Sequence, residues 1–359
     1  MVVKVFVVDD SAVVRQALAH MLAGNSDVEL IGSAPNPLLA MAAIRKNPPD
    51  VLLLDIEMPG MDGLTFLRQI MAGTPIPTVI CSTLSTEGSR VALDALSAGA
   101  VAVLAKPKLG LKQHLDDSRL EMIQTLKTAA RSRPRARGAM PSIAAKAITT
   151  GVAAQIGRMP APSGVHALAM NKPVVIGSST GGTQALELVL TSLPADAPGI
   201  AITQHMPEKF TAMYAQRLDG LCAMNVREAK DGDRLERGVA LIAPGGRHMQ
   251  LRKTNGQYFV KVLDGPPVNR HKPSVDVLFK SAAECAGRDA LGIIMTGMGD
   301  DGARGMKVMH DGGARTIAQN EETCVVFGMP KEAIKLQAVD DILPLEGMAR
   351  AILQFDSRA

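Results

Sequence analysis

The stretch VKVFVVDDSAVVRQALAHMLAG, residues 3–24, decides the fold of the first half of the chain. It opens with a short run, apolar on both faces and rich in valine, that two aspartates end, which predicts a buried strand of a parallel sheet. After the strand, Val14, Leu18 and Leu22 recur at helical spacing, and Gly24 stands where a helix is expected to stop. The stretch therefore predicts one strand-helix unit of an α/β domain.

Four further apolar segments of the same kind follow before about residue 125. They are VELIGSA (28–34), VLLLDI (51–56), TVICST (78–83) and VAVLAKP (101–107). Amphipathic stretches separate these segments, as helices that cover a parallel sheet require. The first half is therefore predicted to be a doubly wound α/β sandwich around a five-stranded parallel sheet.

The same alternation resumes after about residue 172. Three apolar strands are expected in KPVVIGSS (172–179), GIAITQH (199–205) and ALGIIMTG (290–297). Residues 239–263, which lie between them, have the pattern of strands joined in a hairpin, with Asn255-Gly256 at the turn. The second half is thus predicted to be another doubly wound α/β domain, with an antiparallel hairpin insertion.

A compositional break separates the two halves. Residues 127–158 contain seven basic residues and no acidic one, interleaved with proline, glycine and alanine, which predicts a linker. The 359 residues suggest two domains. The predicted boundaries are 1–125 for the first domain, 126–169 for the linker and 170–359 for the second domain.

Composition argues against several classes of protein. The formal net charge is only +4, and 3% of the residues are aromatic, so stacking on nucleic acid is not expected. No recognition helix accompanies the basic stretch RSRPRARG (131–138). No apolar run approaches the ~20 residues of a membrane span, and the N-terminus is not a signal peptide. The four scattered cysteines show no metal spacing, so we expect a cytoplasmic protein with reduced thiols.

Acidic and polar side chains stand where the strands of the first half end. Asp9 and Asp10 follow the first strand, Asp55 the third, Ser82 ends the fourth and Lys106 follows the fifth. The carboxyl ends of parallel strands line one crevice, where grouped carboxylates repel each other unless a hard divalent cation such as Mg²⁺ lies among them. A lysine beside such a site suits phosphoryl transfer to Asp55.

This constellation resembles a response-regulator receiver domain over residues 3 to about 125. The resemblance implies a flavodoxin-like fold, Asp55 as the phosphoacceptor, Mg²⁺ as cofactor and a histidine kinase as phosphodonor. It also implies a metal site formed by Asp9, Asp10, Asp55 and the Glu57 backbone carbonyl. Ser82 is implied as the switch hydroxyl, and Lys106 as the partner of the phosphoryl group. Val103 occupies the position that is often aromatic in such domains, which argues against a ring-flip readout.

VVIGSSTGG, residues 174–182, raises a choice between a phosphate-binding loop and a nucleophile turn. The lysine of the Walker pattern is absent, and the spacing of Gly177, Gly181 and Gly182 does not fit a dinucleotide fingerprint. A serine at a tight strand-to-helix turn is instead exposed beside unpaired helix N–H groups, which are donors for an oxyanion. The pattern therefore favours a nucleophilic serine.

Such a serine needs a base, and the base needs an acid to orient it. Ends of neighbouring strands supply both kinds of residue. Spacing alone leaves alternatives open for each role, namely Ser178, Ser179 or Thr180 as hydroxyl, His205, His248 or His271 as base, and Asp300 or Asp301 as acid.

Five motifs in order, GSSTGG, TQHMP, APGGRHM, HKPSVDVLF and TGMGDDGARG, resemble the catalytic domain of chemotaxis protein-glutamate methylesterases, the CheB family. The resemblance runs from about residue 170 to the C-terminus. It implies Ser179 as nucleophile, His205 as base and Asp301 as orienting acid. It also implies that Thr180 and the backbone N–H near Met298 stabilise the oxyanion.

The resemblance implies a phosphorylation-activated hydrolase that cleaves glutamate γ-methyl esters and deamidates glutamines on the cytoplasmic part of methyl-accepting chemoreceptors. No metal is expected in the catalytic half, and neither nucleic acid nor membrane insertion is expected. The unphosphorylated receiver is expected to block the Ser179 cleft. The alternatives are a receiver-controlled DNA-binding transcriptional regulator, which requires a compact helix-turn-helix after the linker, and a non-catalytic binding module.

Overall fold

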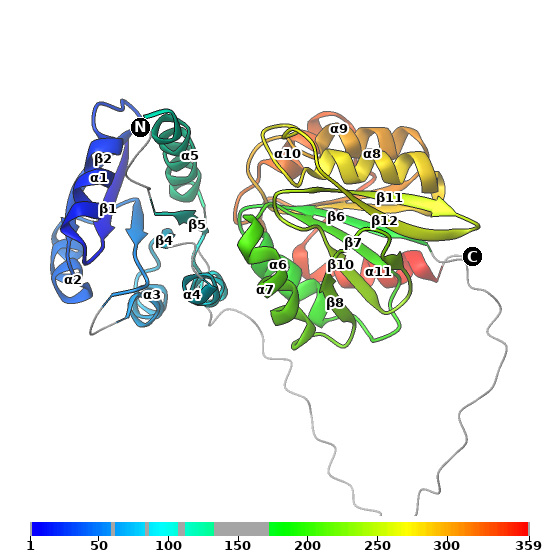
Figure 1. Cartoon of the computed structure of the whole chain (residues 1–359), viewed down its shortest axis with the longest axis horizontal. Helices are drawn as coiled ribbons and strands as arrows, with labels where there is room; N and C mark the ends of the chain where they lie inside the picture. The colour runs from blue at the N-terminus through cyan, green and yellow to red at the C-terminus, as the bar shows by residue number, and fades with distance from the viewer. Residues whose placement is uncertain (1, 59–61, 83–85, 107–111, 133–171, 358–359) are drawn as a thin grey trace, which may run out of the picture.

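The computed structural model describes residues 2–58, 62–82, 86–106, 112–132 and 172–357 (Figure 1). The chain forms two α/β units, and most of the predicted linker, 126–169, lies outside the described ranges. Within those ranges, no helix combines the length and the apolar character that crossing a bilayer requires.

The first unit is built on a five-stranded sheet with the order β2-β1-β3-β4-β5. Every pair of neighbouring strands is parallel, which confirms the predicted sandwich. The strands are β1 (Val3–Val8), β2 (Val28–Ala34), β3 (Val51–Leu54), β4 (Thr78–Ser82) and β5 (Ala102–Ala105). The helices are α1 (Ala12–Leu22), α2 (Pro37–Lys46), α3 (Gly63–Ala72), α4 (Thr86–Ser97) and α5 (Lys112–Ala130).

Alternation along the strands explains the two layers of helices around this sheet. In β1, Val5 and Val7 pack with residues of α1 and α5, whereas Phe6 and Val8 pack with residues of α2, α3 and α4. Successive side chains of a strand point to opposite faces, so a strand covered on both sides is apolar throughout. Helix α1 ends at Leu22, and Gly24 follows at a φ of +70°.

The second unit contains a seven-stranded sheet with the order β15-β14-β13-β6-β7-β10-β8, in which all pairs are parallel. Its strands are β6 (Val174–Ser178), β7 (Ile200–Gln204), β8 (Asn225–Glu228), β10 (Val239–Ile242), β13 (Leu291–Ile294), β14 (Arg315–Gln319) and β15 (Asp341–Leu343). A separate sheet has the order β11-β12-β9, with β9 (Arg234–Leu235), β11 (His248–Thr254) and β12 (Gln257–Leu263).

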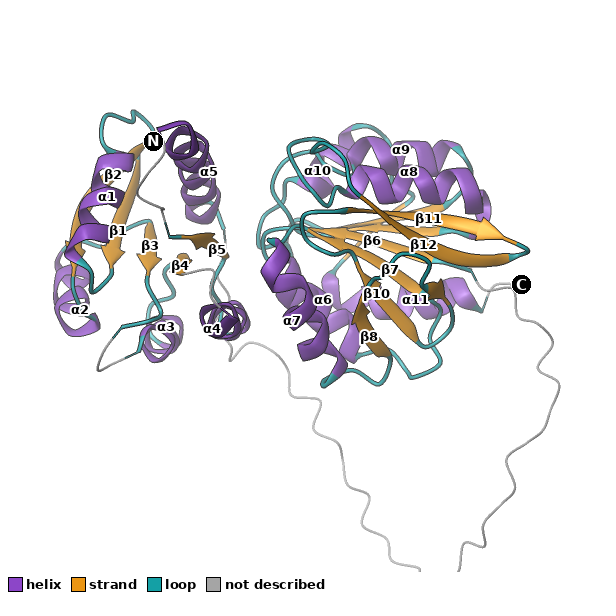
Figure 2. Cartoon of the chain, in the orientation of Figure 1, coloured by secondary structure: helices purple, strands orange, loops and turns teal. Residues whose placement is uncertain are grey.

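Helices cover both faces of the larger sheet (Figure 2). They are α6 (Gly182–Thr191), α7 (Glu208–Asp219) and α11 (Met348–Asp356) on one face, and α8 (Val275–Ala286), α9 (Ala303–Asp311) and α10 (Met329–Lys335) on the other. The predicted hairpin is present, and both residues of its Asn255-Gly256 turn have positive φ, as a two-residue hairpin turn requires. The prediction of a doubly wound domain with an antiparallel insertion is confirmed.

The sequence pattern did not predict four of these strands, β8, β9, β14 and β15. Strands β8 and β15 form the two edges of the larger sheet and are only partly buried, so they lack the apolar run of a central strand. No helix-turn-helix follows as the DNA-binding alternative requires, because residues 172–357 form this α/β domain. That alternative is therefore not supported.

Candidate active site and phosphorylation site

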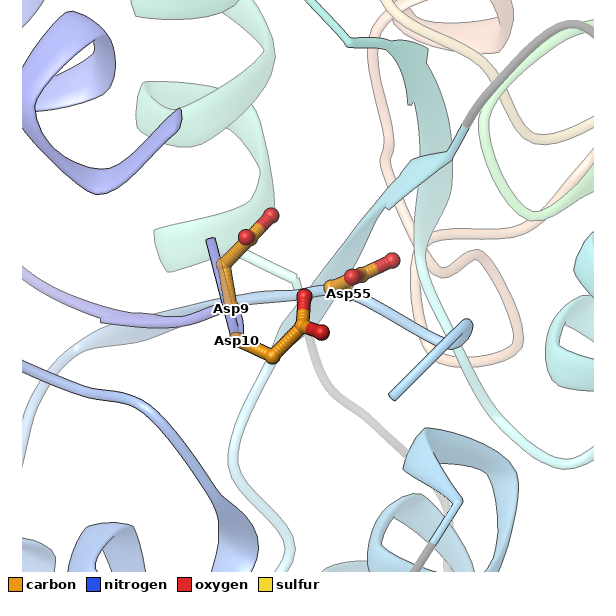
Figure 3. A group of neighbouring side chains, drawn as sticks. All are labelled: Asp9, Asp10 and Asp55. Atoms are coloured by element: carbon orange, nitrogen blue, oxygen red, sulfur yellow. The ribbon is translucent and has the colours of Figure 1, made fainter. Parts of the chain in front are cut away.

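Three carboxylates meet at the carboxyl-end edge of the first sheet. Asp9 and Asp10 follow β1, Asp55 follows the neighbouring β3, and one oxygen from each lies within 4.8 Å of the others (Figure 3). Asp9 and Asp55 are each 1% exposed, whereas Asp10 is exposed. Carboxylate oxygens are the ligands that Mg²⁺ prefers, so this donor set fits such an ion.

The ammonium of Lys106 bonds directly to two of these carboxylates. Its Nζ lies 2.7 Å from Oδ2 of Asp55 and 3.1 Å from Oδ2 of Asp9. Burial lowers the pKa of Lys106, but the bonds to Asp55 and Asp9 outweigh it and raise the pKa above its usual value. Burial raises the pKa of Asp9 despite the lysine. A divalent cation among the three carboxylates would add to the charge compensation that Lys106 supplies.

The other predicted residues of this site lie at the same edge. The backbone N–H of Glu57 donates to Oδ1 of Asp55 over 3.1 Å. Ser82 ends β4 and is buried, and its carbonyl accepts the N–H of Lys106 at 2.9 Å. The structure therefore places all six residues predicted from the receiver resemblance along neighbouring strand ends.

In the second unit, burial separates the candidate hydroxyl groups. Ser178 is the last residue of β6, is fully buried, and donates from Oγ to Oε1 of Gln204 over 2.6 Å. Ser179 and Thr180 follow the strand and are only partly buried. Because the Ser178 hydroxyl is committed to the core, Ser179 is the first serine after the strand that a substrate can reach.

His205 stands at the end of the next strand of the sheet. It follows β7, and its N–H donates to the carbonyl of Ser178 over 3.1 Å. Gln204 holds the two loops together, since its Nε2 donates to the carbonyls of Ser179 at 2.9 Å and His205 at 3.1 Å. Parallel pairing of β6 and β7 thus brings the backbones of Ser179 and His205 to one rim.

The His205 ring is tied to Asp301 through one nitrogen. Its Nε2 lies 2.8 Å from Oδ2 of Asp301. An ionised carboxylate only accepts hydrogen bonds, so Nε2 carries a hydrogen, and in the neutral ring Nδ1 carries the lone pair. Nδ1 is buried and has no hydrogen-bond partner among the described residues. No hydrogen bond links the Ser179 hydroxyl to this nitrogen, and such bonds often tighten only when substrate binds.

Asp301 is a buried carboxylate surrounded by donors. It accepts from the hydroxyl of Ser274 at 2.7 Å, the N–H of Val275 at 2.7 Å and Nδ2 of Asn269 at 2.8 Å. Burial raises the pKa of Asp301, but these bonds and the bond from His205 outweigh burial and hold that pKa well below its usual range. Asp301 is therefore ionised wherever the protein is folded near neutral pH.

His248 and Asp300, which the sequence offered as alternatives to His205 and Asp301, lie in different surroundings. His248 is buried in β11, its Nε2 lies 3.0 Å from the carbonyl of Pro266, and its Nδ1 accepts the N–H of Ser274 at 3.2 Å. Both nitrogens are thus occupied, which leaves no lone pair for a serine proton. The side chain of Asp300 is exposed.

The backbone at Gly297, the residue before Met298, lies against Ser179. A Cβ added to Gly297 would come within 2.8 Å of the Ser179 Cβ, and the N–H of Ser179 donates to the carbonyl of Thr296 over 3.0 Å. Thr180 is held in the same place, because its carbonyl accepts from the hydroxyl of Thr296 at 2.9 Å. Thr180 thus follows the predicted nucleophile in the chain, and Gly297, the residue before Met298, packs against it.

The glycines of this turn serve close packing. A Cβ on Gly182 would lie 2.2 Å from Oε1 of Gln204, and one on Gly177 would lie 2.2 Å from the Val275 side chain. Gly181 directly precedes helix α6 and has a φ of +78°, where other residues are strained. Close packing and a positive φ therefore account for these glycines, and no phosphate-binding role is needed to explain them.

Sequence reasoning missed three residues that shape the site, Gln204, Asn269 and Ser274. Ser274 stands at the residue before helix α8, a position that serine favours, so a helix-start signal could have found it. Gln204 lies in the buried strand β7, where a polar residue signals a specific hydrogen bond. Asn269 lies in a loop, and no pattern in its neighbours indicates its role.

Comparisons with known proteins show which family this chain resembles. The chain matches the family described as CheB methylesterase over residues 174–352 and the response regulator receiver domain over residues 5–115. It is 57% identical to protein-glutamate methylesterase/protein-glutamine glutaminase 1 of Xanthomonas oryzae pv. oryzae, over 96% of this chain and 99% of that relative. It is 55% identical to protein-glutamate methylesterase/protein-glutamine glutaminase 2 of Dechloromonas aromatica, over 98% of each chain.

A solved structure gives the same likeness. The Thermotoga maritima CheB methylesterase catalytic domain is 38% identical to this chain and superposes with a TM-score of 0.50, covering 51% of this chain and 98% of that one.

Proposed function

The chain belongs to the CheB methylesterase family, and from this premise we propose that it is a receiver-controlled serine hydrolase. Its substrates are glutamate γ-methyl esters, and glutamines that it deamidates, on the cytoplasmic part of methyl-accepting chemoreceptors. The observation that carries the proposal is the His205–Asp301 pair, 2.8 Å apart, at the rim where Ser179 follows β6. The cytoplasm is the expected location because the substrate lies there.

In the proposed mechanism, Ser179 is the nucleophile and His205 moves the proton. The Oγ of Ser179 bonds to the ester carbonyl carbon while its proton passes to Nδ1 of His205. The bond to the methoxy oxygen then breaks, and methanol leaves with that proton. Water attacks the acyl-enzyme with His205 as base, the bond to Oγ breaks, and glutamate and the free serine are restored. A glutamine side chain follows the same steps and releases ammonia.

Groups around the site stabilise the charges that develop during the reaction. Asp301 remains ionised beside Nε2 and stabilises the imidazolium that forms on His205. We assign the oxyanion to the backbone N–H near Met298 and to Thr180, because Thr180 follows Ser179 and Gly297, next to Met298, packs against Ser179. One donor of this kind is worth about 3–4 kcal/mol of barrier.

For the receiver, we propose phosphorylation of Asp55 by a chemotaxis histidine kinase. Asp9, Asp10, Asp55 and the Glu57 carbonyl would hold Mg²⁺, which neutralises charge on the phosphoryl oxygens when bound. Lys106 lies 2.7 Å from Asp55 and would pair with the phosphoryl group.

Contacts between the two units support inhibition by the receiver. Arg217 of α7 pairs with Asp94 of α4 at 3.0 Å, and Nε2 of Gln184 in α6 contacts the carbonyl of Leu96. The hydroxyl of Thr128 in α5 contacts the sulfur of Met298, next to the proposed oxyanion site. We propose that the unphosphorylated receiver packs here and keeps the receptor from reaching Ser179.

Removal of residues 1 to about 130 is expected to raise the esterase rate, because the blocking domain is gone. The rise reaches about 100-fold if 99% of the intact enzyme is closed.

In the full chain, Asp94→Arg would repel Arg217 and raise the basal rate by about 2- to 5-fold, as expected for an exposed ion pair. Glu29→Arg, on an exposed residue of β2, is the matched control. An esterase rate that stays unchanged in both the truncated chain and Asp94→Arg would refute the blocking proposal.

The function itself is tested by methanol release from methylated receptor, with and without phosphodonor and Mg²⁺. The intact enzyme is expected to release methanol, and phosphodonor with Mg²⁺ is expected to accelerate release. Asp55→Asn is expected to remove that acceleration and keep the basal rate. Absence of methanol under all conditions would favour a non-catalytic binding module.

A further inference from the structure

A four-residue turn, Val268–His271, lies beside both the base and the acid of the proposed triad. Two backbone hydrogen bonds close it, from the N–H of Val268 to the carbonyl of His271 at 3.0 Å and in the reverse direction at 2.9 Å. Its central residues, Asn269 and Arg270, have φ values of +50° and +68°. Turns of this shape favour Asn-Gly at the two central positions, so an arginine after the asparagine is a strained choice.

The last residue of the turn covers one face of the base. The His271 ring stacks on the His205 ring with centroids 3.7 Å apart and planes inclined by 12°. Burial, with His205 as the next contributor, lowers the pKa of His271 to about 4, so this ring is neutral at pH 7. A neutral ring carries no charge that would repel the imidazolium that forms on His205.

Asn269, the second residue of the turn, holds the proposed triad acid, Asp301. Nδ2 of Asn269 donates to Oδ1 of Asp301 at 2.8 Å and to Oδ2 of Asp276 at 2.9 Å. Asp276 is itself buried and fixed by the N–H of Gly305, which donates to its Oδ1 at 2.6 Å. The amide is therefore anchored at one carboxylate while it orients the other.

We propose that the Val268–His271 turn is a positioning element for catalysis, in which the stacked His271 ring holds the plane of His205 and Asn269 holds Asp301. Among the described residues, the His205 ring has a hydrogen bond at Nε2 and none at Nδ1, so the stacked His271 ring is the further contact that restrains its plane. Neither residue needs to touch the ester, so both act through the triad. This inference rests on the proposed hydrolase function.

Three variants of the full chain test the role of His271. His271→Ala is expected to lower kcat for methanol release by about 10-fold, with KM unchanged, because the stacked ring is lost. His271→Phe keeps a flat neutral ring and is expected to retain kcat within about threefold. His310→Ala, in helix α9, is the control and is expected to match the wild type. A phenylalanine variant as slow as the alanine variant would overturn the stacking role.

Asn269→Gly tests the contact to the acid. Glycine tolerates the positive φ, so the backbone turn is kept while the amide is removed. We expect kcat to fall by about 10-fold, as for loss of a hydrogen bond to a charged group. A variant that melts at a lower temperature but keeps the wild-type kcat would reduce the turn to a structural role. If wild-type enzyme is active and these variants equal it, the turn proposal fails alone; if wild-type enzyme releases no methanol, the hydrolase proposal fails.

Discussion

Ser179→Ala is expected to lower methanol release from methylated receptor by at least about 10⁴-fold, because loss of the nucleophile of a triad removes nearly all of its catalysis. The remaining groups would still bind the ester, so KM is expected to change little. Release of methanol by wild type and variant, measured at saturating receptor, gives the ratio of kcat directly.

Ser178→Ala is the matched control for this prediction. Ser178 is the adjacent serine, but its hydroxyl is buried and bonded to Gln204. Its loss is expected to lower the free energy of unfolding by about 1 kcal/mol and to leave kcat within a few-fold of the wild type. An inactive Ser178→Ala beside an active Ser179→Ala would move the nucleophile to Ser178.

Asp301→Asn is expected to reduce kcat by about 10³- to 10⁴-fold, by analogy with the loss measured for the triad acid of a serine protease. The new amide cannot accept all the hydrogen bonds that Asp301 now receives from Ser274, Val275 and Asn269, and it offers donors to groups that are themselves donors. The amide would also favour a hydrogen on Nδ1 of His205, the wrong nitrogen for accepting the serine proton.

Asp300→Asn is the control for the acid, because that side chain is exposed. It is expected to keep kcat within about twofold, as surface substitutions away from such networks usually do. Thermal melts of both variants separate loss of folded protein from loss of chemistry. Equal activity of the folded Asp301→Asn enzyme and the wild type would contradict the proposed orienting role.

Local sequence was sufficient for the layered fold. Central strands such as β1 and β6 are buried on both faces, so their apolar runs are visible in the sequence itself. The Asn255-Gly256 turn was predictable because its backbone shape demands those residue types. Edge strands such as β15 were not, because their pairing comes from the neighbouring strand rather than from their own pattern.

The sequence by itself determined which residues stand at the carboxyl ends of the strands, since a parallel sheet brings those ends to one edge. It thereby predicted the cluster of Asp9, Asp10 and Asp55. The family resemblance then suggested a role for each residue of the second site.

Only the tertiary structure decided which of the adjacent candidates face the rim. Ser178 and Ser179 are equal in sequence terms, yet one hydroxyl is buried against Gln204 and the other is not. Their surroundings distinguish the histidines in the same way. Both ring nitrogens of His248 are hydrogen-bonded to backbone groups, whereas Nδ1 of His205 has no partner among the described residues. These differences depend on what other parts of the chain place around each side chain, and spacing along the sequence carries no record of that.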